Sequence, residues 1–156
     1  MIAWNILHQN EDCEECVNDT WLKAWNSMPP EKPDALKYFL SAITRNLSLD
    51  CYRRKHSQKR GGGQTDVVLE ELEECLSRSV GPESEVLAKE LTKIINGFLG
   101  DLSVRERKVF IRRYYFVEST AEIAKRYALT ETNVRMILSR TRKKLAVILR
   151  EEGYVL

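Results

Sequence analysis

Residues 119–144 have the apolar spacing of two short helices that are joined by a tight turn. The small side chain of Ala124 lets the two helices cross closely, and the basic side chains of the second helix are expected to point outward. The apolar positions that can close on one another are Ile123, Tyr127, Leu129, Val134 and Ile137, and the basic positions are Arg135, Arg140, Arg142, Lys143 and Lys144. This is the pattern of a helix-turn-helix, whose second helix lies in the major groove of duplex DNA.

The second helix of this pair carries basic residues suited to two kinds of DNA contact. Arginine is the usual partner of guanine in the major groove, whereas the run 140–144 is better suited to phosphates. The side chains predicted to face duplex DNA are Asn133, Arg135, Met136, Ser139, Arg140, Arg142, Lys143 and Lys144. The alternative, a helical hairpin whose basic face is simply solvated, stays open at this point.

Capping signals predict where the helices of this half begin. Ser103 with Glu106, and Ser119 with Glu122, have the spacing of capping boxes. Thr130 is the predicted cap of the last helix, which is expected to run to about Glu151.

Two longer helices are predicted upstream. Residues 11–28 have helical periodicity and end at Pro29-Pro30, and a second helix is expected over 35–56. The broad face shared along the first comprises Cys13, Val17, Thr20, Trp21, Ala24, Trp25 and Met28, and the inward positions of the second are Leu36, Phe39, Leu40, Ile43 and Leu47. Because no strand-like alternation occurs in the sequence, the predicted fold class is all-α.

The segment between the two halves predicts a division into modules. SQKRGGGQTD, residues 57–66, is basic and glycine-rich, as flexible linkers are, and VVLEELEECL is expected to form only a short helix or turn. Gly81-Pro82 then opens the next helix. We therefore expect two small helical modules, 1–58 and 83–156, joined by a flexible linker over 59–82.

Charge alternates strongly along the 156 residues. Residues 37–60 carry seven basic residues against one acidic residue, and residues 101–156 carry thirteen against seven, whereas 1–36 and 61–100 are acidic. Two basic blocks favour two polyanion contacts, although the charge of solvated helix faces alone can vary this much.

The apolar runs are too short for membrane insertion and the start is not a secretory signal, so the expected location is cytoplasmic.

The first basic block differs from the second because aromatic residues accompany it. Trp25, Tyr38 and Phe39 lie on or just before the helix 35–56. Aromatic rings beside cations suit unpaired strands, since bases stack on the rings while phosphates follow the charge. The alternative is that these rings belong to the ordinary core.

The cysteines raise the question of a metal or redox site. Cys13 and Cys16 form a CxxC, but no second CxxC or histidine pair completes a zinc site, and buried thiols explain the spacing equally well. The sequence shows no nucleophile or acid–base pair that resembles an active site. We predict a protein that is not an enzyme and has no metal site and no cofactor, with a thiol redox or zinc protein as a weaker alternative.

EDCEECVNDTWLKAWNSMPP, ALKYFLSAITRNLSLDCYRRK and SVRERKVFIRRYYFVESTAEIAKRYALTETNVRMILSRTRKKL together resemble one family. The family is that of small bacterial RNA polymerase sigma factors of the extracytoplasmic-function type. The first two segments are similar to its region two and the third to its region four. The resemblance implies a promoter-specificity subunit that helps to open DNA at transcription initiation.

The resemblance also implies roles for individual residues. Asp12, Glu15, Asn18 and Asp19 lie where the family docks the coiled coil of the largest polymerase subunit, and Asn46, Asp50, Arg53 and Arg54 lie on the helix that faces the melted minus-ten element. The loop 26–34 matches the place where a flipped base is captured, and 102–115 the part that grips the flap of the second-largest subunit. Arg135, Met136, Ser139 and Arg140 fall where the minus-thirty-five element is read. An anti-sigma factor is a further candidate partner.

The sequence departs from the family pattern at three places. Cys13 and Ala128 stand where the family more often has alanine and glycine. Only MIAWN precedes ILHQNEDCEEC, so region two is expected to be shortened at its N-terminus. The competing function is a stand-alone helix-turn-helix regulator, which would bind a two-fold symmetric duplex without polymerase.

Overall fold

The computed structural model describes residues 2–56, 63–75 and 85–154. Across these residues the chain forms helices and no strand, which confirms the predicted all-α fold. The chain divides into two compact units, Met1–Asp66 and Val67–Leu156. The predicted linker residues 57–62 and the predicted Gly81-Pro82 helix start lie outside the described residues.

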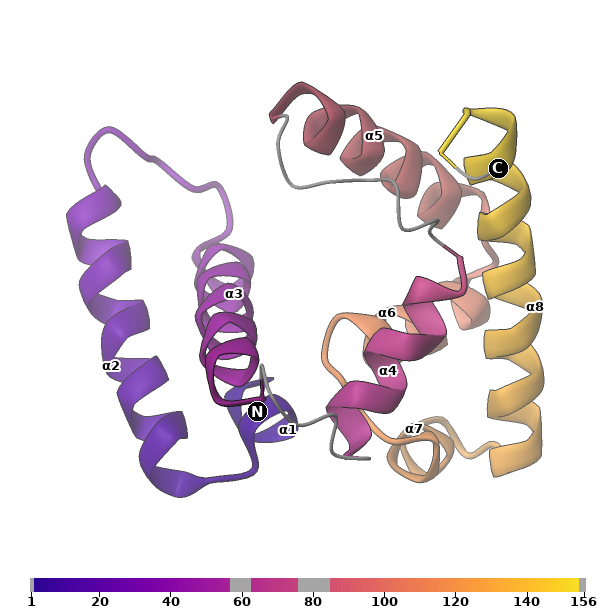
Figure 1. Cartoon of the computed structure of the whole chain (residues 1–156), viewed down its shortest axis with the longest axis horizontal. Coiled ribbons are helices and arrows are strands. Elements are labelled where there is room, and N and C mark those ends of the chain that lie inside the picture. Colours follow the sequence, from indigo (N-terminus) through magenta and orange to yellow (C-terminus); the bar gives the residue numbers. More distant parts are fainter. Residues whose placement is uncertain (1, 57–62, 76–84, 155–156) are drawn as a thin grey trace. The chain divides into compact units, whose positions relative to one another are not determined.

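The first unit contains α1 (Ile2–Leu7), α2 (Asn10–Ser27) and α3 (Leu36–His56), with α2 and α3 side by side (Figure 1). α1 packs against both of the longer helices. The buried side chains come from all three helices: Ile2, Ala3, Ile6, Leu7, Cys13, Cys16, Thr20, Ala24, Ile43, Ser48, Leu49, Cys51 and Tyr52. Thr20 and Thr44 link α2 to α3 through their hydroxyls, 3.1 Å apart.

Several large apolar side chains of the first unit are exposed. Trp21 and Trp25 share a periodic face with buried Cys13, yet their exposed fractions are 59% and 78%. The expectation that Leu36 faces inward is wrong, because 48% of this residue is exposed near the start of α3. The core of α2 is therefore a narrow strip of small side chains that allows α3 to approach closely.

The second unit contains most of α4 (Gln64–Glu73) together with α5 (Glu85–Asp101), α6 (Val104–Tyr114), α7 (Thr120–Tyr127) and α8 (Glu131–Glu151). α8 packs against α5, α6 and α7 (Figure 1). The core side chains of α5 to α8 are Phe98, Val109, Phe110, Tyr114, Ile123, Ala124, Val134, Leu138, Thr141, Leu145 and Leu149. Phe98 and Phe110 meet edge to face, with ring centroids 5.3 Å apart.

The predicted capping signals are confirmed. Ser103 and Glu106 form a capping box at α6, and Ser119 and Glu122 form one at α7. The Thr130 side chain accepts a hydrogen bond from the Asn133 N–H at the start of α8. Each cap satisfies backbone N–H groups that have no partner within their helix, so local sequence fixes where these helices begin.

The turn between α7 and α8 depends on a left-handed backbone at Ala128, where φ is 52°. Glycine adopts this conformation without the steric cost that a Cβ atom imposes. We expect Ala128→Gly to raise the free energy of unfolding by about 0.5–1 kcal/mol in urea titrations. The same change at exposed Ala121, inside α7, should lower it by about 1 kcal/mol. Equal effects at the two positions would contradict this account of the turn.

Candidate nucleic-acid interface

The second unit contains the predicted helix-turn-helix. α7 and α8 pack through Ile123, Ala124 and Val134, which are all buried. Leu129 follows the left-handed Ala128, and its N–H donates to the Ala124 carbonyl, 2.9 Å away. These contacts close a tight turn and fix the direction in which α8 leaves it.

Most predicted duplex-contacting side chains lie on one side of α8. The exposed ones are Asn133, Arg135, Met136, Arg140, Lys143 and Lys144, and Ser139 is half-buried. The opposite side is held in the core by Val134, Leu138 and Leu145. The exposed cations Arg135, Arg140, Lys143 and Lys144 form a cationic ridge on a helix whose other face is fixed by packing. Groove binding requires this geometry.

Two of these cations have carboxylate partners at the surface. Arg135 lies 3.1 Å from Glu131, one helical turn away, and both side chains are largely exposed. Lys144 lies 3.0 Å from Glu106, and its hydrogen bond is the first cause of a lowered pKa of that carboxyl. Pairs whose cation stays largely exposed contribute little stability, so both cations remain able to exchange their partner for a phosphate.

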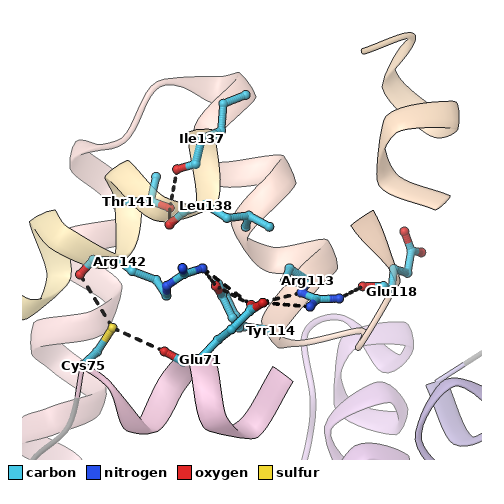
Figure 2. A network of polar contacts seen from close by, with 9 residues as sticks. All are labelled: Glu71, Cys75, Arg113, Tyr114, Glu118, Ile137, Leu138, Thr141 and Arg142. Carbon is cyan, nitrogen blue, oxygen red and sulfur yellow. Dashed lines mark hydrogen bonds and ion pairs between the residues drawn. The ribbon is translucent and has the colours of Figure 1, made fainter. Parts of the chain in front are cut away.

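The expectation that Arg142 points outward is wrong. Its side chain is only 20% exposed, and it donates to the Tyr114 hydroxyl at 2.7 Å. Its guanidinium also lies 3.6 Å from the carboxylate of Glu71, which comes from α4 (Figure 2). The DNA contact of Arg142 stays a prediction, but in the folded unit its side chain is mostly buried against Tyr114 and Glu71.

Glu71 is the centre of a polar network that joins α4 to α6 and α8 (Figure 2). Arg113 binds its two carboxylate oxygens with two hydrogen bonds of 2.9 and 3.1 Å, and Tyr114 donates a third of 3.0 Å. Arg113 also donates to the Glu118 carbonyl, 3.0 Å away. Sequence reasoning missed Glu71, because nothing distinguishes it locally from Glu70, Glu73 or Glu74.

The network changes the acidity of Glu71. Burial alone would raise the pKa of its carboxyl, but the hydrogen bonds and charge of Arg113, with Tyr114 and Arg142, outweigh burial and lower the pKa. Burial raises the pKa of Tyr114, so this residue remains a hydroxyl donor. Glu71 is therefore a half-buried anion with matched donors, which is the arrangement that makes a partly buried ion pair stable.

Acid is expected to destabilise the second unit through Glu71. Because its pKa is lower in the folded than in the unfolded state, its contribution is complete above the ordinary glutamate pKa of about 4.3 and is lost as the pH falls through the folded value. Melting temperatures measured between about pH 6 and about pH 3 should therefore fall less in Glu71→Gln than in the wild type. Equal falls would remove Glu71 from this account.

The residues predicted to face a melted strand lie together on α3. Asn46, Asp50, Arg53 and Arg54 are all exposed, and Arg53 lies 3.9 Å from Asp50. Tyr38 on the same helix is 71% exposed. Phe39 is half-buried. The alternative that these rings belong to the core is therefore wrong for Trp25 and Tyr38, which are exposed, but partly right for Phe39.

The residues predicted to bind polymerase are not equally accessible on α2. Glu15, Asn18 and Asp19 are exposed. Asp12 is 8% exposed and accepts two hydrogen bonds of 2.6 Å from Lys55 of α3. A shallow pocket of about 640 Å³ opens beside the exposed acids, lined by Trp4, Asn10, Cys13, Glu14, Val17 and Asn18.

The CxxC thiols lie in the core of the first unit. Cys13 and Cys16 are both buried, and burial is the first cause that raises the pKa of Cys16, to about 11. A thiol of this kind is mostly protonated near neutral pH and therefore reacts slowly as a nucleophile or metal ligand. Among residues 2–56, 63–75 and 85–154, no group of three potential metal ligands comes together.

Within the same described ranges, no helix has the length and apolarity needed to cross a bilayer.

The chain matches two protein-family models. The model described as Sigma-70 region 2 matches residues 1–58, and the model described as Sigma-70, region 4 matches residues 94–145. No curated protein matches the chain closely enough to count as a relative. The first matched range lies in the first structural unit and the second in the second unit.

Proposed function

The chain belongs to the sigma-70 family of RNA polymerase sigma factors, of the extracytoplasmic-function type, and from this premise we propose that its two halves bind two separate elements of one promoter. Sigma factors act in promoter recognition together with RNA polymerase, and they are regulators without enzymatic activity. The division of labour follows residues 1–58 and 83–156, joined by 59–82. Promoter binding takes place in the cytoplasm, where bacterial RNA polymerase transcribes the chromosome.

In this proposal α8 reads the upstream minus-thirty-five element as duplex. The exposed cationic ridge of α8 is the main support for this role. Asn133, Arg135 and Met136 lie near the helix start, and the opposite face of α8 is packed in the core. Arg135 reads base edges, whereas Arg140, Lys143 and Lys144 contact phosphates. Phosphate contacts provide affinity and register, and base contacts provide sequence preference.

The first unit binds the downstream minus-ten element after its strands separate. Asn46, Asp50, Arg53 and Arg54 face this strand from α3, and the loop 26–34 holds a base that has left the stack. The exposed rings of Trp25 and Tyr38 support this role, because unpaired bases stack on aromatic side chains. Strand opening is then driven by binding energy, without a chemical step.

Core polymerase binds both units. The acids of α2 dock the coiled coil of the largest subunit, and residues 102–115 grip the flap of the second-largest subunit. Glu15, Asn18 and Asp19 support this role by their exposure, and Asp12 contributes by fixing Lys55 of α3 against α2. An anti-sigma factor would compete for the same surfaces.

Binding to core polymerase tests this proposal. We expect the double variant Glu15→Lys with Asp19→Lys to pull down at least about tenfold less core enzyme than the wild type, because two attractive contacts become repulsive. Glu151→Lys makes one of the same charge changes at an exposed position of the second unit and serves as the control. Unchanged binding by the α2 variant would contradict the docking surface, and no binding by the wild type would contradict the function.

A further inference from the structure

We propose that Glu71 of α4 competes with a DNA phosphate for Arg142, so that α4 docked on the second unit lowers the affinity of α8 for DNA. The proposal rests on the proposed function, in which α8 binds promoter duplex. Its new element is that a helix from the segment between the two matched regions acts on the DNA-binding surface within the same chain.

The position of Arg142 on α8 makes it suitable for a DNA contact. It follows Arg135 by seven residues, which is close to two helical turns, so both side chains leave α8 in nearly the same direction. Lys143, next to it, is exposed on the cationic ridge. Arg142 differs from these neighbours because its guanidinium contacts Tyr114 and Glu71, as Figure 2 shows.

The contacts of Glu71 with its two arginines are unequal. Arg113 holds the carboxylate with two hydrogen bonds and is 6% exposed, whereas Arg142 approaches it at 3.6 Å and is 20% exposed. Arg113 therefore anchors Glu71, and Arg142 is attracted to an anion that is already in place. A phosphate at the edge of the ridge would offer Arg142 a full negative charge with more acceptor oxygens.

α4 is suited to docking that can be reversed. It has ten residues, a length at which an isolated helix is marginal in water, so tertiary contacts must hold its residues 67–73 on the second unit. Those contacts include the Glu71 network and the thiol of Cys75, which donates to the Arg142 carbonyl at 3.6 Å. Linkage requires that DNA binding which draws Arg142 away from Glu71 also weakens the docking of α4.

The direct test measures duplex binding by the full chain with and without the Glu71 carboxylate. We expect Glu71→Gln to bind a short fluorescein-labelled duplex of random sequence about three- to tenfold more tightly in anisotropy titrations. The slope of log affinity against log salt should steepen by about 0.9, the value for one added phosphate contact. A merely structural role for Glu71 would not add a phosphate contact.

Glu70→Gln is the matched control, because it removes the same charge from an exposed neighbour on α4. It should leave the salt slope unchanged, and adding Arg142→Gln to Glu71→Gln should abolish the gain. The inference is overturned if Glu71→Gln equals Glu70→Gln, if it binds more weakly, or if its gain survives without Arg142. If the wild type and all variants fail to bind duplex, this inference fails, whereas the proposed function fails only if the wild type does not bind core polymerase.

A second measurement needs no variant. Amide hydrogen exchange in residues 67–73 should become faster when the wild-type chain is saturated with the same duplex, because Arg142 then contributes less to holding α4. Exchange that is unchanged or slower on binding would overturn the inference, even if Glu71→Gln does not fold.

Discussion

Replacing Arg113 by alanine is expected to lower the free energy of unfolding of the second unit by about 3 kcal/mol. Its side chain is 6% exposed and connects α4 to α6, because it binds both carboxylate oxygens of Glu71 and the carbonyl of Glu118. The substitution leaves a partly buried carboxylate and a buried carbonyl without their main donor. Urea unfolding, followed by circular dichroism, measures the loss.

The same change at Arg105 is the control, since this residue is exposed on the same helix. Its effect should stay within about 0.5 kcal/mol. Adding Glu71→Ala to Arg113→Ala should cost less than the sum of the single changes, because the two side chains share one interaction. Additive losses, or an Arg113→Ala effect as small as that at Arg105, would contradict the role assigned to the network.

The second large effect concerns promoter preference. We expect Arg135→Ala to lose about 1–3 kcal/mol of discrimination at one base pair of the upstream element, because the variant cannot make the two hydrogen bonds to guanine that we propose for Arg135. The fold should tolerate the change, since Arg135 is exposed and its pair with Glu131 is a surface pair. Run-off transcription with core polymerase on a promoter library measures the change in preference.

Arg150→Ala removes an arginine from the last turn of α8 and serves as the control. This residue is exposed but lies beyond the predicted contacts, so promoter preference should not change. A preference that is unchanged in Arg135→Ala as well would remove Arg135 from sequence readout and leave it at most a phosphate contact.

Local signals made most of the fold predictable from the sequence. The capping boxes at Ser103 and Ser119 determine where α6 and α7 begin, and the pair Pro29-Pro30 agrees with the end of α2 at Ser27. Such signals act over three or four residues, so a single sequence contains all the information needed. The core positions Ile123 and Val134 followed from periodicity for the same reason.

The position of Arg142 could not be predicted, because its partner Glu71 is far away in sequence. The acidic run around α4 contains four glutamates, and only the docked helix determines which of them meets Arg113. Periodicity likewise assigned Trp21 and Trp25 to the apolar face of α2 but could not distinguish core from exposed surface. Long-range packing decides both cases, and no local pattern records it.

We propose that this chain directs core RNA polymerase to specific promoters, and transcription from a promoter library with purified core enzyme is the decisive test. We predict transcripts from a defined subset of promoters only when the protein is added, with shared sequence at two separated elements. Transcription that stays the same with and without the protein, while the protein alone binds a two-fold symmetric duplex, would contradict the account and favour a stand-alone regulator.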